Sequence, residues 1–121
     1  MNLRLDSKSI RVRVSLEEVK ILAEGGKIQE SLPFPPGYLF LELNETNQEK
    51  LSLDSTGKQW LLNVPKSDLR NLMLSIESVK PASKQALEVR ETIYFESVPI
   101  ELRFEIDCLT TRKNKKEKSH D

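Results

Sequence analysis

The start of the fold is decided by residues 3–19, which read LRLDSKSIRVRVSLEEV. Apolar and polar residues alternate in residues 2–6 and again in residues 9–14. A period of two predicts half-buried strands, because successive side chains of a strand point to opposite faces. The Asp-Ser-Lys-Ser segment between them predicts a tight turn, since Asp and Ser side chains satisfy turn backbone. The segment therefore predicts a hairpin with Arg11 and Arg13 on its polar face.

A helix is expected directly after this hairpin. Ser15-Leu16-Glu17-Glu18 has the spacing of a capping box. In that motif the serine hydroxyl accepts the Glu18 N–H and the Glu18 carboxylate accepts the Ser15 N–H. Gly25-Gly26 predicts the end of the helix.

The rest of the chain predicts more strands and one more short helix. Pro33-Phe34-Pro35-Pro36-Gly37 interrupts a strand pattern and predicts a turn, because proline has no N–H for a strand ladder. A helix is expected from Pro65 through Leu72. Strands are expected at residues 27–33, 38–45, 50–55, 58–64, 74–80, 86–96 and 100–107.

Two parts of the chain resemble each other. Leu3, Leu5, Asp6 and Ser7 align with Leu51, Leu53, Asp54 and Ser55. After a two-residue insertion, Val12, Val14, Val19 and Leu22 align with Leu62, Val64, Leu69 and Leu72, and Ile28 and Ile76 then fall in comparable places. Such a repeat predicts two hairpin-helix-strand halves that bury their apolar faces together.

The expected fold class is α+β, a mainly antiparallel β barrel or sandwich with two short helices. The chain has 121 residues, which suits one domain, expected over residues 1–109. Its 19 basic and 19 acidic residues are unevenly placed, because residues 110–121 hold five basic and two acidic ones. This end has no apolar residue to bury, so a disordered basic tail is expected there.

Composition argues against several classes of function. There is one cysteine, so a disulfide framework is excluded and a cysteine-rich zinc site is not expected. The one histidine, His120, lies in the polar tail, and Cys108 therefore lacks the usual activating base. No apolar run approaches the roughly 20 residues of a membrane span, and no signal peptide begins the chain. We expect a cytoplasmic protein that is not an enzyme, has no cofactor and does not enter a membrane.

Three carboxylates alternate along the last expected strand, namely Glu101, Glu105 and Asp107. Carboxylates that share a face could hold a hard cation, which leaves a carboxylate-metal enzyme as a weak alternative. The favoured interpretation is that they pair across a sheet with Arg11 and Arg13. It requires residues 9–14 to lie beside residues 100–107.

The aromatic residues offer a candidate partner surface. Trp60 alternates in phase with Leu62 and Val64 and is expected in the core. Tyr94 and Phe40 could belong to a binding patch. The best candidates are Phe34, Pro35, Pro36 and Tyr38, because a proline-rich turn leaves apolar side chains exposed and loses little entropy on binding.

Both ends of the chain resemble a bacterial family of small uncharacterised proteins. Members of that family begin with a strand, an Asn-Ser-type turn, Ile-Arg-x-Arg and a capped helix carrying Glu-Val, as residues 3–19 do. They close with Glu-Lys-Asp-Phe-x-Cys-Leu, to which residues 105–109 (Glu-Ile-Asp-Cys-Leu) correspond with isoleucine in place of lysine. The resemblance implies a single cytoplasmic domain and no particular activity.

The same opening also resembles swapped-hairpin, antitoxin-like DNA-binding domains. In those domains, arginines of the hairpin reach DNA from a domain-swapped dimer. The resemblance implies that Arg4, Lys8, Arg11 and Arg13 would be the DNA-binding residues here. Nucleic acid is thus an alternative partner, although residues 1–109 as a whole are mildly acidic. The leading hypothesis is a binding module for an unknown protein partner, and the oligomeric state is left open.

Overall fold

Eight strands and two helices make up the described part of the computed structural model, which covers residues 1–78 and 87–107. Residues 79–86 and the predicted tail, with Cys108 and His120, lie outside it. The elements are β1 (Asn2–Asp6), β2 (Ser9–Val14), α1 (Leu16–Ala23), β3 (Ile28–Phe34), β4 (Gly37–Thr46), β5 (Ser52–Thr56), β6 (Gln59–Pro65), α2 (Lys66–Ser78), β7 (Leu87–Phe95) and β8 (Val98–Ile106).

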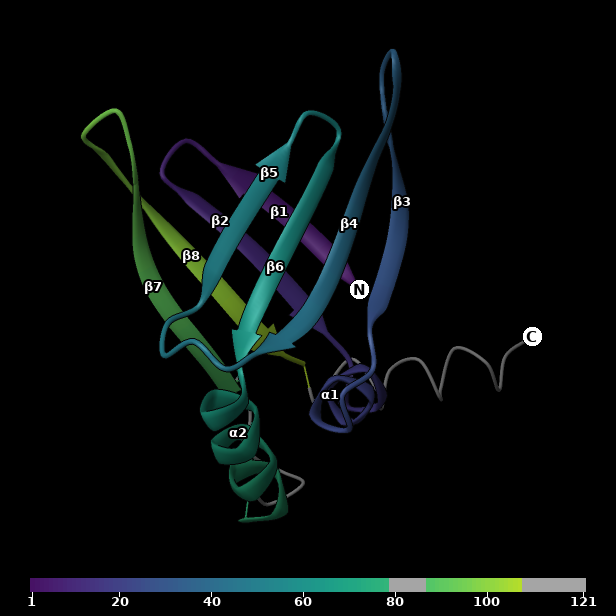
Figure 1. Cartoon of the computed structure of the whole chain (residues 1–121), viewed down its shortest axis with the longest axis vertical. Coiled ribbons are helices and arrows are strands. Elements are labelled where there is room, and N and C mark those ends of the chain that lie inside the picture. The colour runs from purple at the N-terminus through teal and green to yellow at the C-terminus, as the bar shows by residue number, and fades with distance from the viewer. Residues whose placement is uncertain (79–86, 108–121) are drawn as a thin grey trace.

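The strands form two four-stranded sheets that face each other in a sandwich. Sheet A has the order β1-β2-β8-β7 and sheet B has the order β3-β4-β6-β5. Both helices lie at one end, and the turns of all four hairpins lie at the other (Figure 1). The fold is therefore α+β as predicted, and of the two predicted architectures it is the sandwich. Each sheet is mixed, because its two central strands are parallel and its outer pairings are antiparallel.

Each sheet joins a hairpin from the first half of the chain to a hairpin from the second. In sheet A, β2 runs parallel to β8, so Val12 lies beside Phe104. In sheet B, β4 runs parallel to β6, so Leu43 lies beside Leu62. The two halves of the chain are β1-β2-α1-β3-β4 and β5-β6-α2-β7-β8, and each half gives one hairpin to each sheet. When β1 to β4 are matched in order with β5 to β8, sheet B has the same strand order as sheet A.

The registers relate the two halves residue by residue. Asn2 pairs with Arg13 in the first hairpin, and Ser52 pairs with Asn63 in the third, so equivalent residues there are 50 positions apart. Likewise Ile28 pairs with Leu43 and Val89 pairs with Phe104, which gives 61 positions for the other two hairpins. The repeat predicted from sequence exists in the fold, but its two-residue insertion was wrong. Leu3 is equivalent to Leu53, not Leu51.

The two helices differ in how well the sequence predicted them. The capping box of α1 is present, with Ser15 accepting from the Glu18 N–H and the Glu18 carboxylate accepting from the Ser15 N–H. The strand predicted at residues 74–80 was wrong, because α2 continues to Ser78. Leu69, Leu72 and Ile76 are spaced three and four residues apart, so the helical period simply continues. The predicted match of Ile28 with Ile76 was therefore wrong, because Ile76 lies in a helix. The residue equivalent to Ile28 is Val89 of β7.

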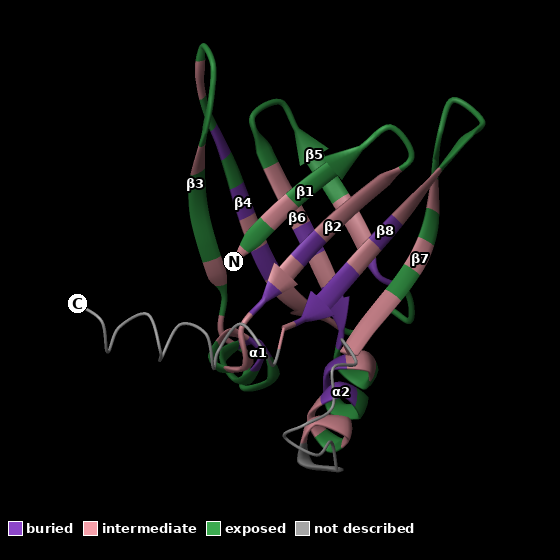
Figure 2. Cartoon of the chain, turned by 180° about the vertical axis from the view of Figure 1, so that it is seen from behind, coloured by how far each residue is buried: buried purple, intermediate pink, exposed green. Residues whose placement is uncertain are grey.

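One apolar core fills the space between the sheets and is closed at one end by the helices. Inward-facing positions of the central strands carry its buried stripe (Figure 2). Trp60 packs partly buried against it, as the alternation predicted. The buried residues are Val12, Val14, Val19, Leu22, Leu41, Leu43, Leu51, Leu62, Val64, Leu69, Leu72, Leu102, Phe104 and Ile106.

The longer edge strand of each sheet carries a glutamate on its inward face. Glu30 of β3 pairs with Leu41, and Glu91 of β7 pairs with Leu102, so the two glutamates are equivalent positions. A charge that points inward at an edge discourages another strand from adding there.

Burial raises the pKa of Asp68 in the first turn of α2, and the charge of Glu91 adds to this effect.

We expect Phe104→Ala to lower the free energy of unfolding by about 3–5 kcal/mol, because it opens a cavity in the core. Phe104 is fully buried, whereas Phe95 is 65% exposed. The matched variant Phe95→Ala should therefore change stability by less than about 0.5 kcal/mol. Urea unfolding followed by circular dichroism measures both, and equal losses would contradict this placement of the core.

Candidate functional site

The outer face of sheet A is built around one buried carboxylate. Glu105 is only 3% exposed although it points away from the core. Its oxygens lie 3.1 Å from Arg13 Nη2 and 3.7 Å from Arg11 Nη1, and Arg13 Nε donates a further hydrogen bond at 3.2 Å. Asp107 accepts from the same Arg13 at 3.3 Å. The predicted pairing with Arg11 and Arg13 of β2 is confirmed for Glu105 and Asp107. It was wrong for Glu101, which bonds to Arg103 of its own strand.

Four arginines line up across this face, one from each strand of sheet A. The registers place Arg4 beside Arg11, Arg11 beside Arg103, and Arg103 beside Arg90. We call these four residues the arginine row. Like charges directly opposite one another destabilise a sheet unless they are compensated. Compensation comes from carboxylates in the flanking positions.

Each carboxylate of β8 faces an arginine. Glu101 bonds to Arg103, and Glu105 lies 3.9 Å from the same guanidinium. Glu88 accepts two hydrogen bonds from Arg90, and this bonding raises the pKa of Arg90. The alternative of a carboxylate-metal enzyme requires Glu101, Glu105 and Asp107 to bind one cation together. Within the described residues, no group of three possible ligands is close enough to hold a metal ion.

The predicted DNA-binding residues do not form one free basic surface. Arg11 and Arg13 are turned toward Glu105, as described above. Arg4 is exposed on the edge strand β1, and Lys8 lies in the exposed turn between β1 and β2. The outward residues of sheet A carry as many acidic as basic groups, because the arginine row and Arg13 are balanced by Asp6, Glu88, Glu101, Glu105 and Asp107.

The proline-rich turn does expose the side chains predicted for partner binding. Phe34 and Tyr38 are each 56% exposed. They flank Pro35 and Pro36, which form the two-residue turn between β3 and β4 and are joined by a cis peptide bond. Phe34 pairs with Gly37, which is in phase with the buried Leu39 and Leu41 of β4, so Phe34 lies on the inward side of sheet B. Tyr38 alternates with these residues and lies on the outward side.

A second aromatic tip stands at the equivalent place in the other sheet. Tyr94 is 72% exposed, Phe95 is 65% exposed and Val98 is 48% exposed. Phe95 is the equivalent of Phe34, and the Glu96-Ser97 turn takes the place of the two prolines. We call the two pairs, Phe34 with Tyr38 and Tyr94 with Phe95, the aromatic tips. Sequence reasoning missed Phe95 and Val98, and a correct repeat register would have found them.

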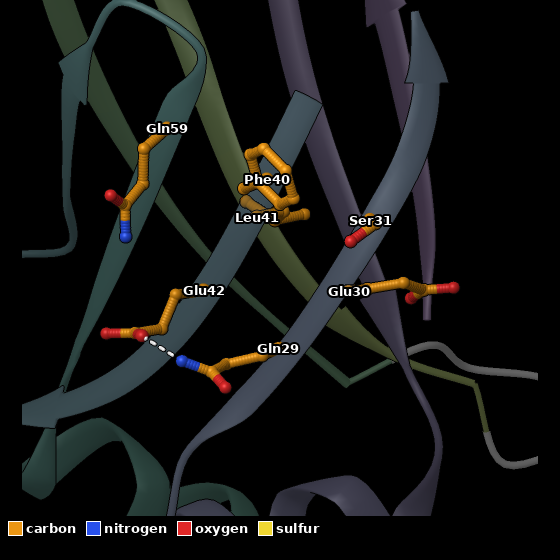
Figure 3. A pocket seen from close by; sticks show the side chains of 7 residues that line it. All are labelled: Gln29, Glu30, Ser31, Phe40, Leu41, Glu42 and Gln59. Atoms are coloured by element: carbon orange, nitrogen blue, oxygen red, sulfur yellow. Dashed lines mark hydrogen bonds between the residues drawn. The ribbon is translucent and has the colours of Figure 1, made fainter. Parts of the chain in front are cut away.

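A shallow hollow of about 320 Å³ lies on sheet B. The exposed ring of Phe40 stands within it, and the other lining residues are Gln29, Glu30, Ser31, Leu41, Glu42 and Gln59 (Figure 3). Gln29 Nε2 donates to Glu42 Oε1 at 2.6 Å. Hydrogen bonds from Gln29 and Asn44 lower the pKa of Glu42, so its carboxylate is ionised at neutral pH.

A further hollow of about 470 Å³ lies at the opposite end of the molecule, where α1 approaches α2. Leu69 and Met73 contribute apolar surface, and Lys66 is held by Glu45 at 3.6 Å. Leu74, on the rim, is 60% exposed.

Comparison with known proteins adds a family to this geometry. A family of unknown function, DUF7009, matches residues 1–121. The chain belongs to DUF7009. No curated protein and no solved structure matches the chain. The resemblance to an uncharacterised family is therefore confirmed at the level of the family.

In this DUF7009 chain, the two stretches that carried the resemblance meet in space. The Ile-Arg-x-Arg segment is residues 10–13 of β2, and the closing Glu-Ile-Asp is residues 105–107 at the end of β8. Their charged side chains form one ion cluster around Glu105, made of Arg11, Arg13, Glu105 and Asp107. An ion cluster around the buried Glu105, between two strands that are far apart in the sequence, accounts for those residue types by a structural role.

We expect Glu105→Gln to lower the free energy of unfolding by about 1.5–3 kcal/mol, since hydrogen bonds to a charged group are lost. The matched control is Glu88→Gln, which breaks the ion pair with the 53% exposed Arg90 side chain. A surface pair is worth less than about 1 kcal/mol, so this variant should stay close to the parent. Urea unfolding at pH 7 compares them, and a smaller loss for Glu105→Gln than for Glu88→Gln would refute the central role of Glu105.

Proposed function

We propose that this DUF7009 protein is a cytoplasmic, non-enzymatic binding module that contacts a protein partner through its aromatic tips. The observation that carries the proposal is that Phe34, Tyr38, Tyr94 and Phe95 are all exposed. The two equivalent hairpins that carry them turn at the same end of the sandwich, on its two opposite sides (Figure 1). Aromatic side chains dominate the energy of protein interfaces, and each of the two tips exposes a pair of them. No helix in the described part of the chain is long and apolar enough to cross a bilayer.

The rigidity of the tips supports the same proposal. Phe34 and Phe95 end strands whose partners continue the ladder to the turn, since Phe34 pairs with Gly37 and Phe95 pairs with Val98. Side chains held on paired strands lose little conformational freedom when they bind. The three carboxylates of the alternative metal site, Glu101, Glu105 and Asp107, are bonded to arginines. Such bonding suits a structural role better than acid-base chemistry.

We expect the double variant Phe34→Ala, Phe95→Ala to lose capture of the partner from a lysate of the source cells. The immobilised full chain would be compared with this variant, and captured proteins quantified by mass spectrometry. Leu74→Ala is the matched control, because Leu74 is also exposed but lies on α2 at the opposite end. Unchanged capture by the double variant, or equal loss in the control, would reject the tips as the interaction surface.

A second candidate function is DNA binding of the swapped-hairpin type by a dimer, through Arg4, Lys8, Arg11 and Arg13. The observation that favours it is that Arg4, on the edge strand of sheet A, and Lys8, in the turn that follows it, are both exposed. The exposed positions of Arg4 and Lys8 would make the first phosphate contacts.

In this alternative, a short mixed-sequence duplex should be retarded in a gel at low salt, with the retardation fading as salt rises. Light scattering should give the mass of a dimer. Arg4→Ala with Lys8→Ala should weaken the shift, whereas Lys20→Ala on α1 should not. A monomeric mass together with no shift at low salt would end the DNA-binding hypothesis.

A further inference from the structure

The outer face of sheet B differs in chemistry from that of sheet A. Tyr38 and Phe40 project from the central strand β4, surrounded by amide and hydroxyl side chains of β3 and β6. Among the outward residues of these four described strands there is no lysine or arginine, and the acidic groups are Glu42 and Asp54. The face is thus neutral to weakly acidic, with Phe40 between β3 and β6 and Tyr38 closer to the proline-rich turn.

The fold itself does not require an aromatic ring at this place. The residue of sheet A equivalent to Phe40 is Glu101, and the same strand arrangement forms there. Phe40 lies between Ser31 and Gln59 in the register, so no apolar neighbour across the strands covers it. It remains 49% exposed. Phe40 and the exposed Tyr38 stand two residues apart on the same face of β4, and an apolar patch that polar side chains surround points to a ligand.

The groups around the ring indicate what such a ligand must offer. Gln29, Ser31 and Gln59 can each donate and accept hydrogen bonds, while the ionised Glu42 only accepts. The ligand therefore needs one apolar face for Phe40 and a rim of neutral donors and acceptors. The described strands of this face carry no lysine or arginine that could hold a phosphate. The nearby Lys27, which precedes β3, already acts on the ionised Glu42, and that carboxylate would repel a phosphate-bearing ligand.

We propose that the outer face of sheet B binds a neutral saccharide chain, with one pyranose ring stacked on Phe40 and its hydroxyls bonded to Gln29, Glu42 and Gln59. A pyranose ring has an apolar C–H face and a rim of hydroxyls, which matches this arrangement. The hollow of about 320 Å³ is open, so it suits one or two rings of a chain that continues over the sheet. A peptide is a poorer match, because β4 and β6 are already paired on both sides and the inward Glu30 discourages a strand from adding at the free edge of β3.

The test is an NMR titration of the full ¹⁵N-labelled chain with cellohexaose, a neutral linear saccharide. Shifts should appear in the side-chain amides of Gln29 and Gln59 and in the backbone of β4. Phe40→Ala should weaken binding about tenfold, since the stacking contact is worth about 1.4 kcal/mol. Phe40→Tyr should retain binding, and Leu74→Ala, away from the face, should leave it unchanged.

A charged sugar separates recognition of ring shape from recognition of charge. Cellohexaose oxidised at C6 to glucuronic acid presents the same rings and linkages with a carboxylate on each ring, and it should bind more weakly than cellohexaose because of Glu42. No shifts with cellohexaose, shifts confined to sheet A or the helices, or equal binding by Phe40→Ala would each overturn the proposal. Gln59→Ala repeats the test if Phe40→Ala does not fold. The aromatic-tip variants leave this hollow intact, so the two proposals fail independently.

Discussion

The parallel contact of β2 with β8, and its counterpart between β4 and β6, is the constraint on which the rest of the structure depends. Without these contacts the four hairpins would be isolated, and two-stranded hairpins are at best marginally stable in water. With them, each hairpin becomes half of a four-stranded sheet with one apolar face. The buried Glu105 reinforces this contact in sheet A, because it binds arginines of β2 from its place on β8.

The two sheets show how one backbone arrangement can carry two unlike surfaces. In sheet A, the line of positions across the strands holds Arg4, Arg11, Arg103 and Arg90. The equivalent line in sheet B holds Asp54, Leu61, Glu42 and Gln29. The core demands similar inward residues in both sheets, whereas the outward residues are free of that demand. Divergence between equivalent outward positions is therefore a better guide to binding than composition alone.

Local patterns and one long-range contact could be predicted from the sequence. The hairpin over residues 2–14 and the capping box at Ser15 follow from interactions between near neighbours, and both are present. The pairing of residues 9–14 with 100–107 could be predicted because arginines alternate with apolar residues along the first segment and carboxylates do so along the second. Charge complementarity of that kind is specific enough to act over a long separation.

Other features depend on information that one chain read locally does not hold. The end of α2 was misplaced because residues 74–78 suit either a strand or a helix until the core selects the helical face. The register of the repeat was misplaced because Leu51 and Leu53 both offer a plausible match to the first hairpin. The hollow around Phe40 was missed because its residues come from three strands and meet only in the folded sheet.

The sharing of each sheet between the two halves also sets the order in which the protein can assemble during its synthesis. β1 and β2 are made first, yet the strand that completes their sheet, β8, is the last described strand to leave the ribosome. The side of β2 that faces β8 must wait without its partner through most of translation, because Phe104 and Ile106, the neighbours of Val12 and Val14, come more than 90 residues later. Contacts so distant in sequence form slowly. A nascent chain of this kind exposes strand edges until its end is made, and inward glutamates on β3 and β7 guard the longer edges once both sheets have closed.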